Sequence, residues 1–270
     1  MTIYEQMLSR YSESDQKAAF EVMQQIALAG LYRSGFFEHA AFYGGTCLRI
    51  FHGLQRFSED MDFSLVAQEP DFKFEQFFPA IIKEFESAGR TVEITKKDKK
   101  NFGRVESAFL KDTTDVYNLT FQHEKSVKVK IEVDTEPPLL FRTEQKLLLM
   151  PFSFMTRCFA LSDLFAGKMH ALVFRAWKNR VKGRDWYDFE WYVRQGIKLS
   201  WNHLHERILQ FNGEDMTREQ FIALLEQKLA STDINLVKAD VEPFIINPHD
   251  LDIWSNDYFL QVAKMMQIED

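Results

Sequence analysis

The feature that most constrains this chain is a glycine turn between a buried strand and a helix, with an acidic strand after it. Residues 40–43 are apolar and lead into Gly44-Gly45-Thr46, while residues 61–66 alternate as a strand does. The glycines permit a turn that side chains would block, and Thr46 is placed to cap a helix that stops at Gly53. The amides of such a turn, with the Thr46 hydroxyl, suit binding of a phosphate group.

Two carboxylates, Asp60 and Asp62, begin the second strand. Residues two apart on a strand point to the same face, so these side chains are expected side by side. Two such charges repel by roughly 4 kcal/mol at about 4 Å in a surface-like dielectric. A divalent cation removes that repulsion, and Mg²⁺ prefers one or two carboxylates together with phosphate oxygens. The pattern therefore predicts a magnesium site beside a phosphate-binding turn.

A third acid is needed if two metal ions are to hold the attacking and leaving oxygens. Residues 127–134 alternate, with Lys128, Lys130, Glu132 and Asp134 on one face. Glu132 is our choice for the third acid and Asp134 is the reserve. An ordinary half-exposed strand gives the same alternation, so both interpretations stay open.

The second half of the chain supplies charges of both signs. Lys168 lies inside an apolar helical stretch, and a lysine there either extends to solvent or reaches an anionic partner. Arg175 is two helical turns further along the same face. Asp185 and Asp188 share a face near the start of the next helix, where the helix dipole favours anions. The competing interpretation is that these acids, Asp185 above all, only cap and stabilise that helix end.

The remaining pattern predicts an α+β fold: a mixed sheet with flanking helices, followed by an α-helical C-terminal half. We expect an α/β domain with the phosphate and magnesium site over residues 1–150 and a helical domain that completes the site over residues 151–270. The expected helices cover residues 14–33, 72–88, 161–177, 185–194, 201–210, 217–229 and 257–266. Further strands are expected at residues 91–95, 105–110, 116–122 and 127–134, and Pro137-Pro138 is expected to close this β-rich stretch.

Composition limits the class of protein. The net charge of −7 over 270 residues opposes nonspecific adhesion to nucleic acid or membrane. Basic clusters at residues 96–100, 125–130 and 175–184 are either solvated faces or local phosphate contacts. Cys47 and Cys158 fit neither a disulfide framework nor a zinc site. We find no apolar run long enough to span a membrane and no secretion signal, so we expect a cytoplasmic protein.

The run from Tyr43 to Phe63 resembles the signature of AbiEii-type nucleotidyltransferases, the toxin halves of abortive-infection and toxin–antitoxin pairs. This family includes the MenT toxins of mycobacteria and belongs to the DNA polymerase beta superfamily of nucleotidyltransferases. The Gly-Gly-Thr…Asp-x-Asp core is shared by that superfamily, whereas Leu48-Arg49 and the run Arg56-Phe57-Ser58-Glu59 point to this branch. The resemblance continues at Lys130-Ile131-Glu132, at Lys168 and from Gly183 to Asp188. It covers roughly residues 40–195.

The resemblance implies roles by position. Gly44, Gly45, Thr46, Arg49 and Lys168 would bind the nucleotide. Asp60, Asp62 and Glu132 would bind Mg²⁺, with Mn²⁺ as an alternative ion. Ser58 would matter for activity, and Asp188 or Asp185 would complete the site from the helical half. Two positions depart from the family pattern: Glu132 stands where aspartate is frequent, and Cys47 where a small residue is usual.

The activity implied is transfer of a nucleoside monophosphate from an NTP to an acceptor hydroxyl, with release of pyrophosphate. RNA, in particular the 3′ end of tRNA, is the expected acceptor, and an antitoxin protein is the expected partner. The alternatives are transfer to a protein or a small molecule, as antibiotic-modifying enzymes do, and a non-catalytic nucleotide-binding protein. The sequence indicates neither the NTP nor the role of residues 196–270.

Overall fold

A computed structural model describes residues 1–11, 16–97, 114–122, 128–175 and 181–270. The chain divides into two compact units. The sheet unit comprises Met1–His52, Ser58–Pro137 and Thr143–Cys158. The helical unit comprises Gly53–Phe57, Pro138–Arg142 and Phe159–Asp270. The strand expected at residues 105–110 lies outside the described residues.

A seven-stranded mixed sheet forms the centre of the sheet unit, in the order β3-β4-β5-β2-β1-β7-β6. β1 is antiparallel to β2 and parallel to β7, and β2 is parallel to β5. β4 is antiparallel to both β3 and β5. The strands are β1 (Ala40–Tyr43), β2 (Asp60–Leu65), β3 (Val92–Lys96), β4 (Thr114–Phe121), β5 (Lys128–Asp134), β6 (Thr143–Leu148) and β7 (Phe154–Phe159).

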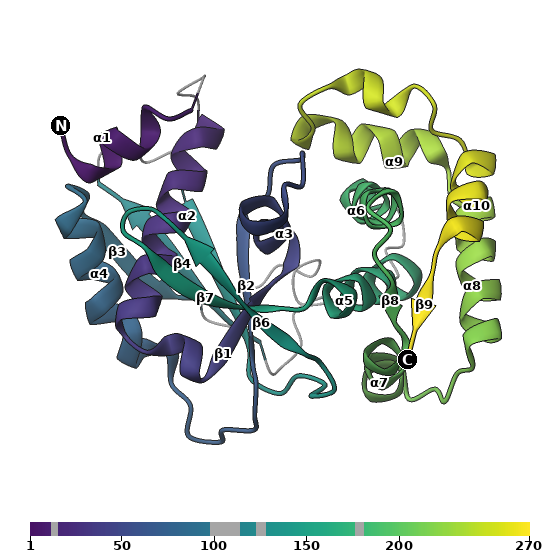
Figure 1. The fold of residues 1–270 in the computed structure, drawn as a ribbon, viewed down its shortest axis with the longest axis horizontal. Helices are drawn as coiled ribbons and strands as arrows, with labels where there is room; N and C mark the ends of the chain where they lie inside the picture. Colours follow the sequence, from purple (N-terminus) through teal and green to yellow (C-terminus); the bar gives the residue numbers. More distant parts are fainter. Residues whose placement is uncertain (12–15, 98–113, 123–127, 176–180) are drawn as a thin grey trace. The chain divides into compact units, whose positions relative to one another are not determined.

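Helices α1, α2 and α4 are grouped together at this sheet (Figure 1). The helices of the unit are α1 (Ile3–Leu8), α2 (Gln16–Arg33), α3 (Gly44–His52) and α4 (Phe78–Ser87), with 3₁₀ turns η1 (Phe36–Glu38) and η2 (Phe74–Phe77). Phenylalanines dominate the core beside them: Phe63 stacks on Phe42 at 4.9 Å and meets the edge of Phe36 at 5.1 Å. Apolar residues of β2 thus fix one of its faces towards the core.

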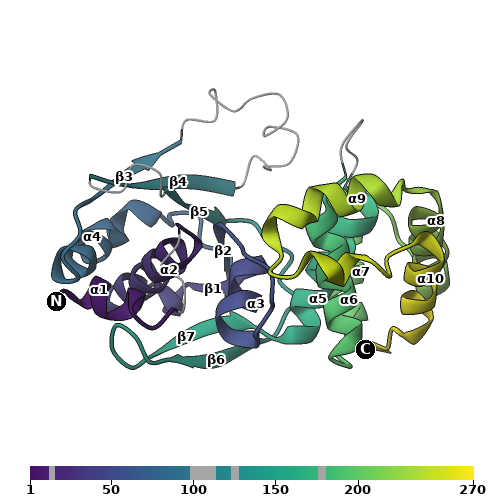
Figure 2. The same ribbon diagram turned by 90° about the horizontal axis from the view of Figure 1, so that it is seen from above.

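The helical unit contains α5 (Leu161–Phe174), α6 (Gly183–Arg194), α7 (Trp201–Asn212), α8 (Arg218–Ser231), α9 (Ile234–Val241) and α10 (Asn256–Met265). A short parallel pair joins β8 (Leu199–Ser200) to β9 (Ile268–Glu269), near the C-terminus. α5 packs on α6 and α7, α9 packs on α6, and α8 packs on α10 (Figure 2). The Thr217 hydroxyl accepts from the Gln220 amide and starts α8 with a capping box.

The predicted α+β class is confirmed, since a mixed sheet with flanking helices precedes a helical second half. Two local expectations were wrong. The β-rich stretch does not close at Pro137-Pro138, because β6 and β7 follow and extend the sheet beyond β1. The helix expected at 72–88 begins as the 3₁₀ turn η2, and Pro79 lies at the start of α4. Within the described residues, no helix has the length and apolar character to cross a membrane.

Candidate functional site

Asp60 and Asp62 lie on one face of β2. Met61 and Phe63 are fully buried on the opposite face, whereas both aspartates are partly exposed. Across the sheet, Asp62 is opposite Tyr43 of β1 and opposite Glu132 of β5, and Asp60 is opposite Lys130. The period-two pattern of a strand therefore places the two carboxylates next to each other and open to solvent.

Gly44 makes room for one of these carboxylates. Its backbone adopts φ +80°, a conformation that favours glycine. A Cβ atom added at Gly44 would lie 2.2 Å from Oδ2 of Asp62. The first glycine of the turn is thus required on two grounds, the left-handed backbone and the close approach of the Asp62 side chain.

Thr46 connects the turn to the acidic strand. Helix α3 begins at Gly44, so Thr46 lies inside its first turn and the prediction that Thr46 caps the helix was wrong. The side chain is fully buried, and its hydroxyl donates a hydrogen bond to the backbone carbonyl of Asp60. This bond ties the start of α3 to the start of β2. The hydroxyl proton is already used, so nucleotide binding at Thr46 stays a prediction.

Lys130 lies among the acids of this face. Its ammonium forms an ion pair with Glu132, the residue two positions along β5. Burial by itself would lower the pKa of Lys130, but the charges of Asp60 and Glu132 outweigh burial and raise that pKa. Lys130 is therefore a fixed cation that offsets part of the negative charge on β2 and β5.

Both residues expected to offer a third acid already have polar contacts. Glu132 is already engaged by Lys130. Asp134 is buried, and its Oδ1 accepts a hydrogen bond from the Glu136 amide at 3.2 Å, which stabilises the turn after β5. In the described part of the chain, no three histidine, cysteine, aspartate or glutamate side chains are grouped so that they could hold a metal ion. The metal-binding role of Glu132 stays a prediction.

Asp60 and Asp62 by themselves fit the needs of one magnesium ion. They offer two hard oxygen donors on one partly exposed face, and the ion binds through one or two carboxylates while keeping water or phosphate oxygens as its other ligands. Asp62 is also held against a glycine turn, where phosphate oxygens find backbone donors.

Two further predicted residues have structural contacts. Ser58 is buried just before β2, and its carbonyl accepts a hydrogen bond of 3.0 Å from Nε2 of Gln24 on α2. Arg49 on α3 pairs through Nε with the Glu21 carboxylate of α2 at 2.7 Å. These contacts hold α3 and the entry to β2 onto α2. The catalytic role of Ser58 and the nucleotide-binding role of Arg49 stay predictions.

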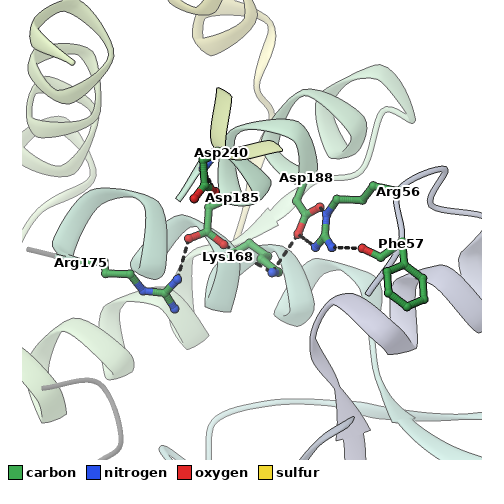
Figure 3. Close-up of polar contacts among 8 residues, drawn as sticks. Arg56, Phe57, Lys168, Arg175, Asp185, Asp188 and Asp240 are labelled. Carbon is green, nitrogen blue, oxygen red and sulfur yellow. Dashed lines mark hydrogen bonds and ion pairs between the residues drawn. The ribbon is translucent and has the colours of Figure 1, made fainter. Parts of the chain in front are cut away.

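A buried charge cluster lies in the helical unit and contains the other predicted residues (Figure 3). Nζ of Lys168 is 2.8 Å from Asp188 and 3.5 Å from Asp185. Nη1 of Arg175 is 2.9 Å from Asp185. The lysine in the apolar helix α5 therefore reaches anionic partners, and it brings Asp185 and Asp188 of α6 together with Arg175.

Asp185 is an ion-pair partner and not a helix cap. The N-cap position of α6 is Lys182, which makes no side-chain capping bond. Asp240 of α9 instead accepts the Gly183 amide at 2.8 Å. Burial alone would raise the pKa of Asp185, but Arg175 and Lys168 hold it well below its usual range. The interpretation of Asp185 as an N-cap is therefore wrong.

Arg56 is the member of this cluster that sequence reasoning did not assign a role. It forms two hydrogen bonds of 2.6 Å with the Asp188 carboxylate, from Nε to Oδ1 and from Nη2 to Oδ2. Burial favours the neutral acid, yet Arg56 and Lys168 keep the pKa of Asp188 low. The sequence contained a signal, because Arg56 belongs to the run that carries the family resemblance.

Comparison with known proteins gives a family and a fold. The sequence pattern of the family described as "Nucleotidyl transferase AbiEii toxin, Type IV TA system" matches residues 26–262. No curated protein matches the chain.

Two solved structures from Helicobacter pylori are similar in fold. JHP933 has a TM-score of 0.52 at 16% identity, with 94% of this chain and 91% of that chain covered. A protein described provisionally as a nucleotidyltransferase has a TM-score of 0.50 at 15% identity, with 94% of each chain covered. Likeness at this level of identity bears on the fold alone.

Proposed function

This chain belongs to the AbiEii family of nucleotidyltransferase toxins of type IV toxin–antitoxin systems. From that premise we propose that it transfers an NMP from an NTP to an RNA hydroxyl, at a magnesium site formed by Asp60 and Asp62. The observation that carries the proposal is the pair of aspartates on one face of β2, with Asp62 lying against the glycine turn. The two features together offer oxygen ligands for a cation and amide donors for a phosphate.

The residues of the chain would divide the work of positioning and charge neutralisation. Asp60 and Asp62 would hold the ion, which when bound offsets triphosphate charge and lowers the pKa of the acceptor hydroxyl. Backbone amides at Gly44 and Gly45 would bind phosphate oxygens. Lys168 would offset the negative charge that grows on the departing pyrophosphate.

The ion pairs of the structure change two of the expectations from sequence: the number of metal ions and the roles of Asp185 and Asp188. Lys130 already supplies one positive charge beside Asp60 and Glu132, so the proposal requires one divalent ion at Asp60 and Asp62. Asp185 and Asp188 form ion pairs with Lys168, and in this proposal they complete the site through that lysine. An antitoxin is the expected protein partner of a chain in this family, since the family is described by such a system.

RNA is the acceptor we propose, with the 3′ end of tRNA as its specific form. The support is the family resemblance alone, because Lys96 of the basic cluster at 96–100 already pairs with Asp115 at 3.0 Å and Glu75 at 3.2 Å. The net charge of −7 implies that RNA binding is local and weakens strongly with salt.

The test supplies each labelled NTP with Mg²⁺ to the purified protein, with total RNA in one arm and nucleic-acid-free lysate protein in the other. We expect label in RNA, and the same experiment with Asp60→Ala or Asp62→Ala should give none while circular dichroism stays unchanged. Label in protein would assign a protein acceptor instead. Undiminished incorporation by both variants would refute the magnesium site.

A further inference from the structure

Arg56 is a fully buried arginine whose hydrogen-bonding groups are turned inward. Its side chain is 2% exposed and the Asp188 side chain is 0% exposed. Besides the two bonds to Asp188, Nη1 donates to the Phe57 carbonyl at 3.0 Å (Figure 3). The planar guanidinium meets both carboxylate oxygens at once, which gives a fixed orientation that a lysine does not supply.

The carboxylate that Arg56 binds is also the nearer partner of Lys168. Oδ2 of Asp188 lies 2.6 Å from Nη2 of Arg56 and 2.8 Å from Nζ of Lys168. Asp188 is therefore not the counter-ion of Lys168 alone. Its single negative charge is shared with a guanidinium that has no access to solvent.

Three cations of the cluster share the same two carboxylates. Arg56, Lys168 and Arg175 form ion pairs with Asp185 and Asp188. Arg56 and both carboxylates are sealed from solvent, whereas the side chains of Lys168 and Arg175 are 17% and 24% exposed. Lys168 and Arg175 are consequently the cations of this group that an anionic ligand can reach.

We propose that Arg56 is a positioning residue for Lys168: by neutralising Asp188, it leaves the Lys168 ammonium available to a phosphate group. This inference rests on the proposed function, because that function makes the triphosphate of the NTP the ligand. Without Arg56, Lys168 and Asp188 would form an ordinary neutral pair, and binding of phosphate would have to break it.

A purely structural role makes a different prediction. If the Arg56–Asp188 pair only joins the Gly53–Phe57 segment to α6, its loss lowers stability and leaves phosphate affinity unchanged. Removing one partner of a buried pair is strongly destabilising because a charge is left uncompensated. Affinity and stability must therefore be measured separately on each variant.

The probe is inorganic tripolyphosphate, which carries the charge of the ligand and does not depend on the base. Its dissociation constant is measured by titration calorimetry with the full chain and Mg²⁺, and thermal unfolding is recorded in parallel. Arg56→Gln removes one positive charge from the cluster, and we expect its affinity to fall by about tenfold or more, the size of a charge-assisted contact. Arg56→Lys keeps the charge and should bind within about threefold of wild type even if it unfolds at lower temperature.

The double variant Arg56→Gln/Asp188→Asn separates charge from packing. It removes one charge of each sign, returns the cluster to the net charge of wild type, and should recover the affinity lost by Arg56→Gln. Should Arg56→Gln fail to fold, Asp188→Asn decides. It removes the nearer carboxylate of Lys168, so the inference predicts tighter binding than wild type, and affinity equal to or weaker than wild type overturns it. Equal affinity of Arg56→Gln and wild type also overturns it.

Two controls keep this result apart from the proposed function itself. Arg33→Gln breaks an arginine–carboxylate pair outside this cluster, with Nε of Arg33 2.6 Å from Glu84 and the Arg33 side chain 54% exposed, and should leave affinity unchanged. Lys168→Met should lose affinity; if it does not, Lys168 is not the contact and the inference about Arg56 fails. Absence of tripolyphosphate binding by wild type would instead count against the proposed nucleotide site.

Discussion

At the scale of single residues, the Gly44 position tests why the glycine turn is needed. In Gly44→Ala the new Cβ meets Oδ2 of Asp62 and the backbone is held at φ +80°. We expect a loss of about 1–2 kcal/mol of stability from the backbone and a fall in activity of roughly a hundredfold from displacement of the carboxylate.

Gly53→Ala is the matched control for that prediction. Gly53 has φ +74° and nothing within 4 Å of an added Cβ. It should show a similar loss of stability in thermal unfolding while nucleotidyl transfer is retained. Equal loss of activity in the two variants would mean that contact with Asp62 is not the reason for Gly44.

The sequence predicted part of the site at this scale. Asp60 and Asp62 could be placed side by side because a strand has a fixed period of two, whatever the rest of the fold does. The ion pairs Glu132–Lys130 and Arg56–Asp188 could not be predicted, since each depends on which of several nearby charges lies closest. The spacing of 132 positions between Arg56 and Asp188 contains no local signal of contact.

At the scale of elements, two helical glycines of the helical unit should respond in opposite directions to the same substitution. Gly167 lies within α5, and an added Cβ would be 4.0 Å from the Arg207 guanidinium carbon. Gly167→Ala should therefore raise stability by about 0.5–1 kcal/mol, the usual gain in a helix interior.

Gly183 starts α6 where that helix touches α9. An added Cβ would be 2.1 Å from the Val237 carbonyl oxygen and 3.0 Å from the Val241 amide. Because both are backbone atoms, Gly183→Ala should cost about 1–3 kcal/mol. Differential scanning calorimetry of the two variants should show transitions shifted up for residue 167 and down for residue 183; a downward shift in both would contradict this packing.

Element predictions from sequence succeeded where the pattern was long and periodic. α2, α7, α8 and α10 lie close to their expected ranges because apolar residues recur at helical spacing. The strands β6 and β7 were missed because two prolines precede them and their exposed residues obscure the alternation. α9 was missed because its eight residues are too few for a periodic signal.

At the scale of the whole molecule, buried histidines should make stability depend on pH. Burial lowers the pKa of His52 in the sheet unit from 6.5 to about 4, and burial with the Arg207 charge lowers that of His203 in the helical unit from 6.5 to about 3. Below pH 6.5 these two histidines bind protons in the unfolded chain but stay neutral in the folded chain. Stability should therefore fall as pH falls from about 6.5 towards 4.

His203→Phe isolates one of these groups. The substitution removes the proton site and keeps an aromatic ring beside Phe141 and Phe159. We expect it to spare about 1–2 kcal/mol of the stability that wild type loses between pH 7.5 and pH 5. Identical pH profiles for wild type and His203→Phe would contradict the burial argument.

The class of fold and the family followed from sequence, whereas the acceptor did not. A strand, a glycine turn and two acids restrict a chain to few arrangements, and the family match over residues 26–262 agrees with that restriction. Selection of an acceptor depends on surface shape and charge, which the spacing of residues along the chain does not encode.

Binding of Mn²⁺ in the presence of tripolyphosphate, followed by electron paramagnetic resonance, tests the central claim most directly. Asp134→Asn is the control, because Asp134 shares a face of β5 with Glu132 and its carboxylate accepts a hydrogen bond from the Glu136 amide in the turn after β5. The side-chain amide oxygen of asparagine can accept that bond instead. We predict one bound ion per chain for wild type and for Asp134→Asn, and none for Asp60→Asn or Asp62→Asn. Undiminished Mn²⁺ binding by both site variants would contradict a cation site at Asp60 and Asp62.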